Sequence, residues 1–82
     1  MSTEQRDGAR AHVPKRARIV FERGHSAIDC VVLDLSPRGA RLRVGLWLGL
    51  PDSFHLRMEN GAVHEARVRF RRLGEIGVEF VD

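Results

Sequence analysis

The sequence contains no tyrosine and only one cysteine, one tryptophan and three prolines. A single cysteine, Cys30, excludes an internal disulfide, which agrees with a reducing compartment. The longest stretch without charge, Val44 to Pro51, has eight residues, whereas a membrane helix needs roughly 20. The first ten residues lack the apolar segment of a secretory signal. We therefore expect a cytosolic protein without a membrane span.

Groups suited to catalysis or metal binding are equally sparse. The four histidines, His12, His25, His55 and His64, lie in four separate segments, and none has a partner at metal-ligand spacing. Cys30 stands among apolar residues, which favours a buried, inert thiol over a nucleophile. Neither common type of glycine-rich phosphate loop is present. We expect no enzyme activity, no metal and no cofactor.

The 82 residues suffice for one domain with a small core, since a chain of this length buries only roughly 60–65% of its unfolded surface. With 43% hydrophobic residues the chain is too apolar for a disordered protein. Residues 1–43 have a charge balance of +4 and residues 44–82 one of −1. The basic half would attract an anionic partner, while the net charge of +3 is modest for binding long duplex DNA.

Residues 1–13 show little apolar periodicity and precede Pro14, so they predict a flexible arm ahead of a domain over residues 14–82. From there the pattern alternates with period two. It predicts strands at residues 16–22, 27–35, 40–44, 54–58, 62–72 and 76–80. No segment favours a helix. Closing six short antiparallel strands removes their exposed edges, so we expect a small six-stranded all-β barrel.

Within residues 62–72, the alternation predicts inward Ala66, Val68 and Phe70 and outward arginines between them, at positions 67, 69 and 71. All four phenylalanines are expected to face inward. Residues 45–52 predict a loop packed on the barrel, with Trp47 as a plug over the barrel end.

Two short motifs lie near predicted turns. Arg6 and Arg10 form an RxxxR spacing on the arm. Asp34, Ser36 and Gly39 form a DxSxxG spacing, which ends one predicted strand and turns into the next. Proline at position 37 presets one dihedral angle of this turn, and glycine tolerates a positive one. Each motif alone is weak, because thirteen arginines make RxxxR frequent by chance.

Together, and in this order before an all-β pattern, the motifs resemble the PilZ family of receptors for the bacterial second messenger cyclic di-GMP. The resemblance extends from Glu4 onward. Residues 15–21 resemble the family's first strand, residues 28–44 its motif hairpin and residues 68–80 its closing hairpin. It implies a cyclic di-GMP receptor that signals to a downstream protein partner.

The resemblance also implies roles for the motif residues. Arg6 and Arg10 would contact phosphate and guanine as the arm folds over the ligand, since guanidinium groups suit both. Asp34 would accept from the N1–H and N2–H₂ edge of guanine, with Ser36 beside it. Gly39 would let the backbone approach the ligand closely. Such binding would order the arm and create a surface for a partner.

Some positions extend or depart from the family's pattern. Arg38 and Arg41 lie beside the motif and are secondary candidates for ligand contact. Gln5 stands where many members have a further arginine. In the family that arginine is associated with a stacked pair of ligands, so its absence here favours one cyclic di-GMP per site. Phe70 stands where many members carry tryptophan. The sequence ends at Asp82 without the helix that some members append.

Other interpretations stay open. Asp34 and Ser36 suit turn capping, and Arg6 and Arg10 suit a solvated tail. The domain is also compatible with a protein-interaction module that has lost its ligand. A barrel that binds single-stranded nucleic acid is less favoured, because that mode needs exposed aromatic platforms.

Overall fold

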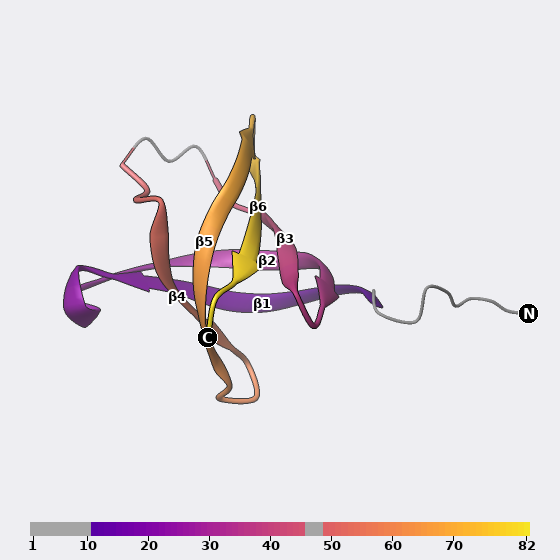
Figure 1. Cartoon of the computed structure of the whole chain (residues 1–82), viewed down its shortest axis with the longest axis horizontal. Helices are drawn as coiled ribbons and strands as arrows, with labels where there is room; N and C mark the ends of the chain where they lie inside the picture. Colours follow the sequence, from indigo (N-terminus) through magenta and orange to yellow (C-terminus); the bar gives the residue numbers. More distant parts are fainter. Residues whose placement is uncertain (1–10, 46–48) are drawn as a thin grey trace, which may run out of the picture.

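The computed structural model describes residues 11–45 and 49–82, with the backbone alone for residues 11–13. Six antiparallel strands form a closed barrel in the order β1-β2-β3-β6-β5-β4 (Figure 1). Their bounds are β1 Ala11–Phe21, β2 Ser26–Ser36, β3 Gly39–Arg43, β4 Ser53–Met58, β5 Val63–Arg72 and β6 Glu75–Phe80. The predicted six-stranded barrel is thus confirmed, and every strand is paired on both sides.

The longest element is the β1–β2 hairpin, which crosses the direction of β4, β5 and β6 in Figure 1. Strand β1 begins at Ala11, earlier than the predicted start of the barrel at residue 14, and Ala11 pairs with Leu35. The first residues of β1 therefore lie beside the end of β2. The arm that carries the RxxxR motif, residues 1–10, lies outside the described residues.

The core is built from the inward faces of all six strands. Ile19 pairs with Leu56 across β1 and β4, and Val32 pairs with Leu42 across β2 and β3. All four of these side chains are completely buried. Cys30 lies in the same cluster, and its burial, more than the nearby charge of Asp29, raises the pKa of the thiol to about 12. This environment is that of the inert thiol that the sequence predicts.

The connections are short. A one-turn 3-10 helix, Glu22–Gly24, joins β1 to β2. Between β4 and β5, Gly61 has a φ of 92°, as the Asn-Gly sequence predicts, and its N–H donates to the carbonyl of Met58. In the loop before β4, Leu50 is buried, whereas Trp47 lies outside the described residues.

A β-bulge in β5 changes which of its side chains face the core. Val68 pairs with Val78 of β6, but Phe70 pairs with Gly77, so Arg69 is an extra residue. The alternation is therefore shifted by one position beyond Arg69. The prediction of an inward Phe70 is wrong, because its ring lies on the outer face over Gly77 and is 39% exposed.

Because of the same bulge, Arg71 does not lie on the outward face that the alternation predicted. This residue pairs with Ile76, a core residue, and directly opposite residues share a face of the sheet. Its guanidinium donates to the carbonyl of Leu50 and to Asp52 at the end of the barrel. Arg71 thus holds the loop before β4 in place.

A second irregularity lies in β2 at Leu33. The register jumps from Val32 paired with Leu42 to Asp34 paired with Arg41. On the other side of β2, the register jumps from Lys15 to His12, which leaves two residues of β1 opposite Leu33. As a result Asp34 points to the outer face of the barrel.

Gly39 is required for a reason other than its dihedral freedom. Among the described residues, the glycines with positive φ are Gly24, Gly61 and Gly74, so the turn at Gly39 does not use the positive φ that glycine tolerates. Instead, a Cβ at Gly39 would lie 2.1 Å from the carbonyl oxygen of Val78. Strands β3 and β6 can approach this closely only because position 39 has no side chain.

We therefore expect Gly39→Ala to destabilise the barrel, because the new methyl group meets backbone rather than a movable side chain. Overpacking of this kind costs about 1–3 kcal/mol, and each 1 kcal/mol lowers Tm by about 4–8 °C in a domain of this size. Thermal unfolding followed by circular dichroism measures the change. The control is Gly45→Ala, where a Cβ meets nothing within 4 Å. An unchanged Tm in Gly39→Ala would contradict the packing described.

Candidate functional site

The centre of the candidate site is an ion pair between Asp34 and Arg41 on neighbouring strands. Arg41 Nε donates to Asp34 Oδ2 at 2.7 Å, and its Nη1 donates to Glu75 Oε1 at 3.2 Å. The Asp34 side chain is only 7% exposed. The hydrogen bond to Asp34 is the main cause that raises the pKa of Arg41 above its ordinary value. Arg41 thus holds a buried carboxylate in one orientation.

The turn that follows is short and held by Ser36. Ser36 pairs with Gly39, so the loop between β2 and β3 consists of Pro37 and Arg38 alone. The Ser36 hydroxyl accepts from the N–H of Arg38 at 3.3 Å and donates to the carbonyl of Gly39 at 3.4 Å. Both distances are long, so these bonds are weak. The hydroxyl can exchange them for a ligand at small cost.

A pocket of about 640 Å³ lies on the outer face over this hairpin and the neighbouring strands β5 and β6. The motif hairpin contributes Asp34, Ser36 and Gly39, while β5 contributes Arg69 and Phe70. Because Phe70 lies on the outer face, the pocket has an aromatic wall opposite the motif.

Of the residues singled out in the sequence, the structure brings Asp34, Ser36, Gly39, Arg38 and Arg41 together around this pocket. Arg41 was a candidate for direct ligand contact; the structure shows it bound to Asp34 and Glu75. Asp34 therefore has a partner on β3, and Ser36 makes the contacts of a turn-capping residue.

Arg6 and Arg10, the two arm residues of the predicted site, lie outside the described residues. Arg10 directly precedes Ala11, whose partner Leu35 lies between Asp34 and Ser36. The register of β1 and β2 therefore brings Ala11, the residue that follows Arg10, to the motif hairpin.

Lining residues of the pocket that sequence reasoning missed include Arg69, Phe70 and Glu79. Arg69 and Glu79 form an ion pair with each other. The glycine at position 77 was a signal for Phe70, since a small residue opposite an aromatic one leaves space for the ring. A Cβ at Gly77 would lie 2.0 Å from the Phe70 ring.

The charges of the pocket are mostly neutralised within it. Its two acids, Asp34 and Glu79, are each paired with an arginine. Arg38 is exposed and has no acidic partner in the part of the chain that the structure describes. The pocket lining thus supplies about one unpaired positive charge.

Within residues 11–45 and 49–82, no three histidine, cysteine or acidic side chains are grouped so that they could hold a metal ion. The same residues include no helix with the length and apolar character needed to cross a membrane.

Comparison with known proteins identifies the family of the chain. The model of the PilZ domain matches residues 4–82, nearly the whole chain. The PilZ family is a family of binding and receptor domains that is known for cyclic di-GMP. No curated protein matches the chain. The matched range includes both motifs and all six strands, and the chain therefore belongs to the PilZ domain family.

Proposed function

We propose that this domain is a cyclic di-GMP receptor that binds one ligand in the outer-face pocket over the β2–β3 hairpin. The observation that carries the proposal is the buried Asp34 carboxylate, oriented by Arg41 at the edge of a pocket of about 640 Å³. A fixed carboxylate is a suitable acceptor for the N1–H and N2–H₂ donors of guanine. Ser36 adds a hydroxyl beside it.

The phosphates of the ligand need more positive charge than the pocket contains. Since only Arg38 is unpaired among its described lining residues, the ligand's two phosphates require cations from elsewhere. Arg6 and Arg10 of the arm are the proposed source, and Ala11 enters the barrel beside Leu35. Arginines offer paired donors to phosphate oxygens and a flat cation for a purine face.

Phe70 supports the same assignment from the opposite wall. Its partly exposed ring gives a purine an apolar surface at the pocket. Arg72 lies over this ring, with its Cζ 4.9 Å from the centroid. A base that packs against Phe70 would therefore lie near a further cation.

In this proposal the domain is a receptor, not an enzyme, and requires no cofactor or metal. The sequence predicts that binding orders residues 5–12, but residues 11 and 12 already pair with β2. Binding therefore draws residues 5–10 across the turn at residues 34–39, and the ordered arm forms a surface that a downstream protein recognises. A cytosolic location is part of the same proposal, as the sequence composition predicts.

The position of Phe70 affects one alternative, a barrel that binds single-stranded nucleic acid. The outward Phe70 removes one argument against it, because the sequence had placed every phenylalanine inward. Yet Phe70 is the single exposed aromatic side chain among the described phenylalanines, and nucleic-acid barrels stack successive bases on several rings. The cyclic dinucleotide fits the pocket better.

Calorimetric titration with cyclic di-GMP tests the role of Asp34. We expect Asp34→Asn to weaken binding by about tenfold or more, because a hydrogen bond to a charged group contributes about 1.5–3 kcal/mol. Arg10→Ala should remove most of the binding heat. Wild-type affinity should fall as salt rises, since arginine–phosphate contacts are screened.

Two variants control for indirect effects. Glu75→Gln removes the second partner of Arg41 but keeps the Asp34–Arg41 contact, so its loss should be smaller. Asp52→Asn changes an exposed acid away from the pocket and should bind as the wild type does. If Asp34→Asn and the wild type titrate alike, Asp34 does not bind the ligand.

Amide hydrogen exchange tests the proposed ordering of the arm. Saturating cyclic di-GMP should slow exchange at residues 5–10 and leave the core strands unchanged, because residues 11 and 12 are already paired with β2 and only the preceding arm gains new contacts. Equal protection of residues 5–10 with and without bound ligand would rule out the ordering step while leaving the pocket assignment intact.

A further inference from the structure

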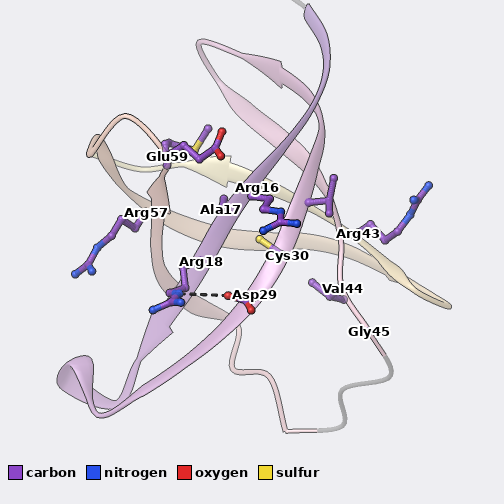
Figure 2. A pocket seen from close by; sticks show the side chains of 12 residues that line it. Arg16, Ala17, Arg18, Asp29, Cys30, Arg43, Val44, Gly45, Arg57 and Glu59 are labelled. Atoms are coloured by element: carbon purple, nitrogen blue, oxygen red, sulfur yellow. Dashed lines mark hydrogen bonds and ion pairs between the residues drawn. The ribbon is translucent and has the colours of Figure 1, made fainter.

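A larger hollow, of about 780 Å³, lies over strands β1, β2 and β4 and the end of β3, away from the turn at residues 34–39 (Figure 2). It shares no lining residue with the cyclic di-GMP pocket. Its floor is apolar and includes Ala17, Cys30 and Val44, each at most 8% exposed, with Met58 beside them. This surface is suited to an aliphatic side chain.

The rim of this hollow is basic. Arg16, Arg43 and Arg57 are exposed, and none has an acidic partner within residues 11–45 and 49–82. Arg18 is paired with Asp29 at 3.2 Å, and both of these side chains are largely exposed. Exposed pairs of this kind contribute little and exchange readily. The rim therefore holds three unpaired cations and a fourth that is weakly engaged.

The guanidinium groups of the rim lie apart and do not point toward one common position. Figure 2 shows Arg43 and Arg57 at opposite margins of the hollow, with their guanidinium groups directed away from each other, and Arg16 between them. One small anionic group cannot reach both margins. An occupant with several separate negative charges around an apolar group matches this arrangement.

Backbone pairing around the hollow is partial, since β1 pairs with β4 only at residues 17–20 and β2 pairs with β3 only at residues 31–36. The features that select an occupant are the apolar floor and the arginine side chains of the rim. Nucleic acid is the poorer match, because the described lining residues include no aromatic ring on which a base could stack.

We propose that this hollow, the basic hollow, is the docking site for an acidic protein segment that places an aliphatic side chain on the floor and carboxylates against Arg16, Arg43 and Arg57. The partner class is an acidic, partly apolar polypeptide. The site does not depend on the cyclic di-GMP pocket, although Arg43 and Arg41 lie on the same strand, β3, two residues apart.

A peptide titration followed by NMR tests the proposal on the full chain without cyclic di-GMP. The probe is a synthetic peptide in which two leucines are flanked on each side by glutamates. It should shift the amide signals of residues 16–18, 29–31 and 57–59 and the methyl signals of Ala17 and Met58. A peptide with glutamine for glutamate, and one with serine for leucine, should each bind at least tenfold more weakly.

Matched variants distinguish the loss of rim charge from a loss of folding. Arg16→Gln combined with Arg57→Gln should weaken the peptide about tenfold, whereas Arg67→Gln, an exposed arginine outside both pockets, should leave it unchanged. The double variant should still bind cyclic di-GMP as the wild type does, so failure of one site is distinguishable from failure of the other.

Three outcomes overturn the proposal. They are the absence of shifts around the basic hollow at millimolar peptide, equal binding of the glutamate and glutamine peptides, and binding of an oligothymidine at this site in preference to the peptide. The last result would assign the hollow to single-stranded nucleic acid instead.

Discussion

The site depends on how a small barrel accommodates a buried carboxylate on its outer face. An unpaired buried charge is costly, so Asp34 needs a cation held at close range. Arg41 supplies it from the adjacent strand at 2.7 Å, and Glu75 holds Arg41 from the strand beyond. This chain of contacts links β2, β3 and β6. It fixes an acceptor at the edge of a pocket before any ligand is present.

Much of this structure could be predicted from local patterns. Period-two alternation indicated six strands, and the turn residues indicated where the chain reverses. The DxSxxG spacing identified Asp34, Ser36 and Gly39, which the structure places on one pocket. The Asp34–Arg41 contact was also within reach of the sequence, because a two-residue loop at positions 37 and 38 sets position 34 opposite position 41.

The remaining features depend on pairing between distant strands. The bulge at Arg69 exchanges the faces of Phe70 and Arg71, and the alternation of β5 alone carries no record of it. The need for glycine at position 39 comes from the carbonyl of Val78, a contact between segments far apart in the sequence. Turn chemistry singled out Gly39 but could not reveal this contact. The roles of Arg6 and Arg10 rest on their connection to Ala11 and stay predictions.

The central claim is that cyclic di-GMP lies against Asp34 on the outer face of the β2–β3 hairpin. The most direct measurement is chemical-shift mapping by NMR during a titration of the full chain with cyclic di-GMP. We expect the largest changes at residues 34–39 and at Phe70 and Gly77, with the signals of Ala17 and Met58 unmoved. Changes concentrated around Ala17 and Met58, or none at millimolar ligand, would contradict it.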